Sequence, residues 1–110
     1  MSGNNLTDQG SKMAHSENDI AEAVVMIASS QPNGFASFDV LRAEIPKTLN
    51  LDAIDTKPSQ TRPNEQMWEQ LLRNIKSHSE AEGNFIYEGY LEHVKGAGYR
   101  VTELGRAHFS

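Results

Sequence analysis

Four polar side chains recur at helical spacing in the middle of the chain: Gln66, Gln70, Arg73 and Ser77. Residues three or four positions apart fall on one face of a helix. Arginine can grip guanine, glutamine can pair with adenine, and serine can reach either base, so this face indicates contact with nucleic acid. Any solvated helix has a mixed polar face, however, and Glu69 on the same side would repel phosphate. A solvated face without a ligand therefore stays open as the alternative.

A second group of basic residues surrounds a glycine-rich turn at 96–98. Lys95 at the tip and Arg100 on the return strand could straddle a phosphate ridge or enter a minor groove, since glycine permits close approach. Lysine and glycine are also common in any exposed turn, so this interpretation has an equally simple alternative. The complete set of candidate DNA contacts is Lys57, Arg62, Gln66, Gln70, Arg73, Lys76, Ser77, Lys95 and Arg100.

No catalytic, metal or cofactor site is expected from the remaining reactive residues. The chain has no cysteine, and it contains no P-loop or G-x-S-x-G motif. His78 and Glu82 are four residues apart, but one such pair falls short of a three-ligand zinc site. The histidines are scattered along the sequence: His15, His78, His93 and His108.

The chain is acidic overall, with a formal net charge of −5, and its charges are unevenly distributed. Its length of 110 residues allows one domain with a modest core. A nonspecific coat for nucleic acid is not expected, since phosphate neutralisation needs a basic surface. Residues 16–55 hold seven acidic residues against two basic ones, whereas residues 56–76 hold four basic against two acidic. No secretory signal or apolar run of ~20 residues is present, so a cytoplasmic protein without membrane contact is expected.

The first half of the chain reads as a tail followed by two helices. Residues 1–15 are polar and predict a disordered tail, and residues 16–110 predict one domain. Ser16 is a candidate N-cap for a helix that stops before a turn at 31–34. After a short extended piece, Ser37 caps a second helix that is expected to end at Pro46.

A long connection over residues 47–63 precedes the strongest helical pattern in the sequence. This third helix is predicted over residues 64–82, with Pro63 at its first position and Gly83 at its end. Its apolar stripe contains Trp68, for which core packing is favoured over base stacking. The other stripe residues are Met67, Leu71, Leu72 and Ile75.

The last third of the sequence predicts strands and one short helix. Residues 85–87 and 90–94 read as strands, and the turn at 95–98 leads into a return strand at 99–101, which is a hairpin pattern. Thr102 then caps a final helix. The order predicts an α+β fold, a winged helix-turn-helix with three helices, a C-terminal hairpin wing and a short last helix.

Two stretches carry a resemblance to a known family: PNEQMWEQLLRNIKSH at 63–78 and GYRVTELGR at 98–106. They resemble the winged-helix domains associated with restriction endonucleases, of which the N-terminal domain of Mrr-type systems is the best-known member. The shared features are Trp68 early in the third helix, Arg73 about a turn later, and the wing exit that runs from Tyr99 to Arg106. The resemblance covers roughly residues 17–109.

The resemblance implies a duplex-DNA-binding protein, either a small regulator or an accessory subunit of a restriction or defence system. The 110 residues contain no nuclease domain after the hairpin, so cleavage is not carried over, and the segment NFIYEG at 84–89 is an addition to the family pattern. A homodimer or a larger complex is compatible with this function. A winged helix used as a protein-interaction module, without DNA affinity, remains the alternative.

Overall fold

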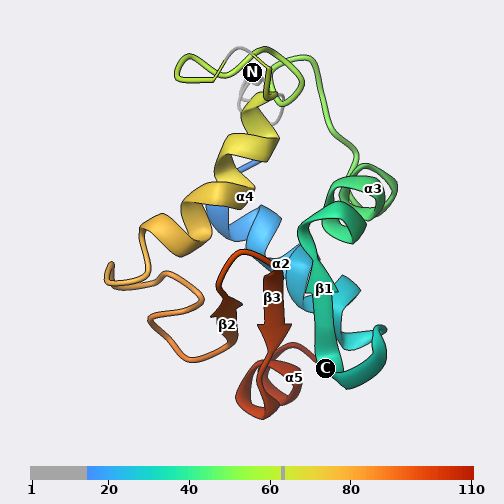
Figure 1. Ribbon diagram of the computed structural model, residues 1–110, viewed down its shortest axis with the longest axis vertical. Coiled ribbons are helices and arrows are strands. Elements are labelled where there is room, and N and C mark those ends of the chain that lie inside the picture. The colour runs from blue at the N-terminus through green and yellow to red at the C-terminus, as the bar shows by residue number, and fades with distance from the viewer. Residues whose placement is uncertain (1–14, 63) are drawn as a thin grey trace, which may run out of the picture.

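A computed structural model describes residues 15–62 and 64–110 (Figure 1). These residues form helices packed against a three-stranded antiparallel sheet, which confirms the predicted α+β class. In chain order the elements are α2 (Glu17–Ser29), a 3-10 turn (Pro32–Gly34), β1 (Phe35–Ser37), α3 (Phe38–Thr48), α4 (Met67–Ser77), β2 (Leu91–Val94), β3 (Gly98–Val101) and α5 (Glu103–Phe109).

Helix α2 is the central element of the core. It begins with the predicted cap, because the hydroxyl of Ser16 accepts a hydrogen bond from the N–H of Asp19 at 3.0 Å and the Asp19 carboxylate accepts one from the N–H of Ser16 at 2.9 Å. Ile20 and Val24 are fully buried on the inner face. The helix packs against α3, α4, α5 and β3 and so holds these elements in place around it (Figure 1).

Strand β3 lies in the middle of the sheet, between β1 and β2. β2 and β3 form the predicted hairpin, with Leu91 opposite Val101. The extended piece at 35–37 pairs with the other edge of β3 and becomes a third strand. This close pairing requires glycine at position 98, because a Cβ there would collide with the carbonyl oxygen of Ala36.

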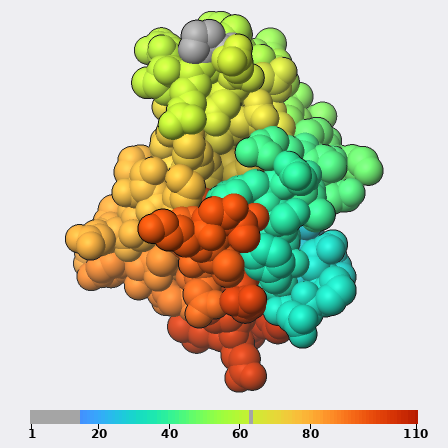
Figure 2. All heavy atoms as spheres, viewed as in Figure 1, coloured from blue at the N-terminus to red at the C-terminus, as the bar shows by residue number. Residues whose placement is uncertain are grey.

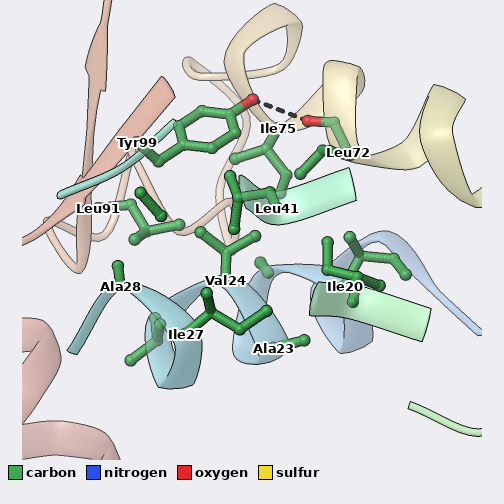
Figure 3. Packing of buried hydrophobic residues seen from close by; sticks show 14 of the residues in the cluster. Ile20, Ala23, Val24, Ile27, Ala28, Leu41, Leu72, Ile75, Leu91 and Tyr99 are labelled. Atoms are coloured by element: carbon green, nitrogen blue, oxygen red, sulfur yellow. Dashed lines mark hydrogen bonds between the residues drawn. The ribbon is translucent and has the colours of Figure 1, made fainter. Parts of the chain in front are cut away.

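Tyr99 joins the hairpin to α4 inside the core (Figure 3). Its side chain is fully buried, and its hydroxyl donates to the carbonyl of Leu72 at 2.7 Å and accepts from the N–H of Lys76 at 3.1 Å. Those two backbone groups are partners in the regular i to i+4 pattern, so the hydroxyl lies between successive turns of the helix. Burial raises the pKa of the phenol, which keeps the O–H protonated as a donor.

Helix α3 continues beyond its predicted end. Ser37 caps the first turn as expected, accepting a backbone N–H at 3.1 Å. The prediction that the helix ends at Pro46 is wrong, because α3 runs through this proline to Thr48. Proline removes only one backbone donor near the end of a helix. The next turn still closes, with the N–H of Leu49 donating to Ile45 at 2.9 Å.

Helix α4 is shorter than predicted, although its phase is correct. Trp68 in its apolar stripe is 4% exposed, which confirms the core assignment. The expected range 64–82 is wrong, since the helix spans Met67–Ser77. Its chain leaves helical geometry at His78, before Gly83, and the predicted first position, Pro63, lies outside the described residues.

Residues 85–87 form turns and not the predicted strand. The buried side chain of Asn84 accepts hydrogen bonds from the N–H groups of Ile86 at 2.7 Å and Tyr87 at 3.1 Å. An asparagine that bonds the backbone two or three residues ahead folds the chain back on itself. This local bonding overrides the strand preference of the aromatic and branched side chains.

The loop between α3 and α4 is fixed by the fully buried carboxylate of Asp55. This carboxylate accepts hydrogen bonds from the N–H of Asp52 at 3.0 Å and from the N–H of His15 at 2.8 Å, and it lies 2.8 Å from the His15 ring. Burial alone would raise the pKa of Asp55, but these hydrogen bonds more than offset it and the pKa lies below the ordinary range. His15 is therefore part of the fold and not of the predicted tail, and residues 1–14 lie outside the described residues.

The C-terminal helix begins at the predicted cap. The Thr102 hydroxyl accepts from the N–H of Gly105 at 2.9 Å and donates to the carbonyl of Gly89 at 2.6 Å. No helix in the described part of the chain has the length and apolar character of a membrane span. Helix α2, with 13 residues, is the longest of them and falls short of the ~20 that a bilayer requires.

Candidate nucleic-acid interface

The predicted contact residues lie on α4, on the loop before it and on the β2–β3 hairpin. Figure 2 shows the tip of the hairpin, in orange-red, on the same face of the molecule as α3 and α4. Because the Tyr99 hydroxyl joins the hairpin to α4, these elements have a fixed relation to one another.

Arg73, one of the predicted contacts, forms a two-point ion pair with Glu65. Its Nη2 donates to Oε1 of Glu65 at 2.9 Å, and its Nε donates to Oε2 at 3.3 Å. The two side chains are 23% and 22% exposed, so the pair is neither entombed nor fully solvated. The hydrogen bond lowers the pKa of the Glu65 carboxyl and raises the pKa of the Arg73 guanidinium. Arg73 therefore has a fixed orientation.

Further basic side chains lie near the carboxylates of Glu65 and Glu69. The charges of Arg62 and Arg42 add to the hydrogen bond from α4 in lowering the pKa of Glu65. Arg42 also approaches Glu69, with 3.8 Å between Nε and Oε2. We call four cations the basic cluster: Arg42, Arg62, Arg73 and Lys76. Three carboxylates lie against the cluster: Glu65, Glu69 and Asp39, whose Oδ1 accepts from Nη1 of Arg42 at 3.0 Å. The four cations therefore exceed these carboxylates by one charge.

A small pocket of about 80 Å³ opens between α3 and α4 at the basic cluster. Its charged lining holds three cations and two carboxylates, and among the described residues only Lys76 of these cations forms no ion pair. The lining residues are Phe38, Arg42, Glu65, Glu69, Leu72, Arg73 and Lys76.

Lys76 on α4 and Lys95 on the hairpin lie on the same side of the molecule. Burial is the main cause of a lowered pKa at His93, and the charges of both lysines lower it further. The imidazole packs beside the rings of Phe38 and Tyr99, with ring centres 6.4 and 5.9 Å away, and its Nε2 is buried without a hydrogen-bond partner among the described residues. The ring is thus held neutral, and the local positive charge comes from the lysines.

Arg100 is less available than the sequence predicts. It lies directly opposite Glu92 in the hairpin and donates to its carboxylate at 3.1 Å. Its guanidinium also lies 5.6 Å from the ring centre of Phe35, within the range of a cation–π contact. Both contacts are local to the sheet.

The two glutamines and the serine on α4 already have partners in the protein. The side-chain oxygen of Gln66 accepts from the indole N–H of Trp68 at 2.8 Å. The side-chain oxygen of Gln70 accepts from the hydroxyl of Ser59. Ser77 is exposed and donates to a backbone carbonyl of the preceding turn at 3.4 Å. These bonds engage the side-chain oxygens of the glutamines and the hydroxyl hydrogen of Ser77.

The loop before α4 contributes two exposed cations, Lys57 and Arg62. The carbonyl of Lys57 accepts from the N–H of Met67 at 2.8 Å, so its backbone lies beside the start of the helix. Among the described residues, neither side chain forms an ion pair, and the same holds for Lys76 and Lys95.

Sequence reasoning missed Arg42 and the role of Glu65. Arg42 is one of only two basic residues in the acidic stretch 16–55, and this isolation was an available signal. Glu65 precedes α4 in an irregular loop, so helical periodicity does not reveal its partner eight residues later.

Metal-ligand geometry is absent from residues 15–62 and 64–110, where no three histidine or carboxylate side chains gather to hold an ion. His78, which the sequence pairs with Glu82, instead lies 2.8 Å from a carboxylate oxygen of Glu17 on α2. This contact ties the end of α4 to the central helix.

Comparison of the chain with protein-family models, with curated proteins and with solved structures found no match.

Proposed function

We propose that residues 16–110 form a winged-helix domain that binds duplex DNA through α4 and the β2–β3 hairpin. The element order of helix, strand, helix, helix and hairpin supports this assignment, as does the sheet order β1-β3-β2. In helix-turn-helix proteins the second helix of the motif enters the major groove. Helix α4 takes that role here, and the hairpin is the wing.

The observation that carries the proposal is the concentration of positive charge on this surface in a chain of net charge −5. The basic cluster lies along α4 and its neighbours, and Lys95 extends it onto the hairpin. Phosphate neutralisation supplies most of the affinity of proteins for duplex DNA. A confined basic surface on an otherwise acidic protein suits a defined DNA contact and disfavours coating.

The basic side chains of this surface fall into two groups, those without an ion-pair partner among the described residues and those that are paired with a carboxylate. Lys57, Arg62, Lys76 and Lys95 form no ion pair among the described residues, which suits contacts with phosphates. Arg73 is oriented by Glu65, which suits contact with a base edge. Phosphate contacts position the protein on the duplex, whereas base contacts specify sequence.

The biological role is proposed on the resemblance alone. The wing-exit pattern and Trp68 support a small regulator or an accessory subunit of a restriction or defence system. A homodimer that reads two half-sites fits the same role.

The proposal is tested by titrating the protein into a labelled random-sequence duplex at two salt concentrations. Four phosphate contacts give a slope of about −3.6 in log K against log salt, so affinity should fall about 150-fold between about 50 and about 200 mM salt. Absence of duplex binding at the lower salt concentration would overturn the proposal.

One observation favours the alternative of a protein-interaction module. Met26 on α2 is 61% exposed and borders a concave surface shared with Phe109 at the C-terminal end of α5. An interaction module without DNA affinity would leave the duplex titration flat at both salt concentrations. The titration therefore separates the two functions.

A further inference from the structure

The ion pair between Arg73 and Glu65 uses only one edge of the guanidinium. Glu65 accepts from Nε and Nη2, the side edge of the group. Among the described residues, no hydrogen bond engages Nη1. The end edge, formed by Nη1 and the second N–H of Nη2, therefore remains able to donate.

Glu65 is itself held by the backbone. Its carbonyl accepts from the N–H of Ser59 at 2.7 Å, and its N–H donates to the carbonyl of Arg62 at 2.8 Å. The residue lies just before the N-cap of α4 and is therefore part of the loop and not of the helix. Arg73 is thus held by a carboxylate whose own backbone is fixed on both sides.

The free end edge has the geometry of a guanine contact. Two parallel N–H donors match O6 and N7 of guanine in the major groove, and this is the commonest specific contact between protein and DNA. Fixing the guanidinium beforehand removes the freedom that it would otherwise lose on binding. In the major groove, adenine, cytosine and thymine offer no such pair of adjacent acceptors.

We propose that Glu65 is a positioning residue that orients Arg73 so that its end edge reads a guanine in the major groove. This inference rests on the proposed function, because it assigns a base preference to the same surface. It predicts a specificity that the phosphate-contacting cations do not supply.

A different role for Glu65 makes a different prediction. If the carboxylate only screened Arg73 from phosphate, its removal would tighten binding to every duplex and leave base preference unchanged. If it positions Arg73, its removal weakens discrimination even where overall affinity rises. The screening role and the positioning role of Glu65 are therefore distinguished by the preference among bases and not by the overall affinity for duplex DNA.

The test begins with selection of duplexes from a pool with a randomised core, using the wild-type protein. Each guanine of the selected duplex is then replaced in turn by 7-deazaguanine, which keeps base pairing but lacks the N7 acceptor. We expect one guanine at which this replacement lowers wild-type affinity about tenfold. A purely structural role for the Arg73–Glu65 pair would not produce this sensitivity.

The variants assign the sensitivity to the pair. Arg73→Ala should abolish the 7-deazaguanine effect, and Glu65→Ala should reduce it to less than half of its wild-type size on a logarithmic scale. Glu65→Gln, which keeps shape and one acceptor, should fall between the wild type and Glu65→Ala. Glu92→Ala is the matched control, since it removes a carboxylate paired with Arg100 and should leave the effect intact. Circular dichroism establishes that each variant is folded.

The outcomes are distinct. No duplex binding by the wild type overturns the proposed function and this inference together. Duplex binding without sensitivity to 7-deazaguanine overturns the inference alone and leaves DNA binding standing. Full sensitivity in Arg73→Ala or in Glu65→Ala overturns the assignment to the pair.

Discussion

Replacing Lys95 with glutamine removes one cation from the tip of the hairpin without altering the core, since the side chain is exposed. Four cations at the interface have no ion-pair partner among the described residues: Lys57, Arg62, Lys76 and Lys95. Each phosphate contact contributes about 0.9 to the slope of log K against log salt. The slope should therefore change from about −3.6 to about −2.7.

The difference is large enough to measure by fluorescence anisotropy with a labelled duplex. Between about 50 and about 200 mM salt, the loss of affinity should shrink from about 150-fold in the wild type to about 40-fold in Lys95→Gln. Paired cations such as Arg100 should add less, because they must first exchange a carboxylate for a phosphate.

Lys47→Gln is the matched control for this measurement. Lys47 lies on α3, is 71% exposed and pairs with Glu44 at 3.3 Å, so its replacement changes the net charge equally but away from the hairpin. Its slope should equal that of the wild type. Equal slopes for Lys95→Gln and the wild type would refute the placement of the hairpin at the phosphates.

Three stability predictions follow from the core and the hairpin. Trp68→Ala should lower the free energy of unfolding by about 3–5 kcal/mol in urea titration, and a loss below ~1 kcal/mol would contradict its burial. Tyr99→Phe should cost about 1–3 kcal/mol, because the Leu72 carbonyl loses its buried donor; an unchanged midpoint would contradict the hydroxyl bridge. The folded-state pKa of His93 lies below its unfolded value of about 6.5, so its contribution to stability is complete above that pH and is lost as pH falls toward the folded-state pKa. Thermal unfolding of His93→Gln should therefore depend less on pH below 6.5 than that of the wild type, and equal dependence would contradict the burial of this ring.

Helical periodicity predicted the buried side of α4 correctly but not its length. Trp68, Leu72 and Ile75 recur at helical spacing and are all buried. The ends were wrong because periodicity does not register tertiary contacts: the loop pairs Gln66 with Pro58 just before the helix, and the chain turns at His78. Local propensity cannot predict the pairing of the loop or the position at which the helix ends.

The strand predicted at 85–87 failed for a reason that was present in the sequence. Asn84 immediately precedes it, and asparagine commonly bonds the backbone ahead of it to form a turn. Aromatic and branched residues raised the strand expectation, but their preference depends on a neighbouring strand to pair with.

The composition of the candidate interface was only partly readable from the sequence. The helical wheel identified Arg73, and the glycine turn identified Lys95. The wheel could not place Glu65 or Arg42 beside α4, because one belongs to an irregular loop and the other to a different helix. The internal partners of the glutamines likewise depend on the folded path of the loop.

Binding of DNA by α4 and the hairpin is tested most directly by following the backbone amide resonances by NMR while duplex DNA is added to the protein. We expect shifts concentrated in the loop from Lys57, in α4 and in the hairpin around Lys95, with little change along the exposed side of α2 near Met26. Shifts centred on α2 and α5, with α4 and the hairpin unchanged, would contradict the assignment of the DNA surface.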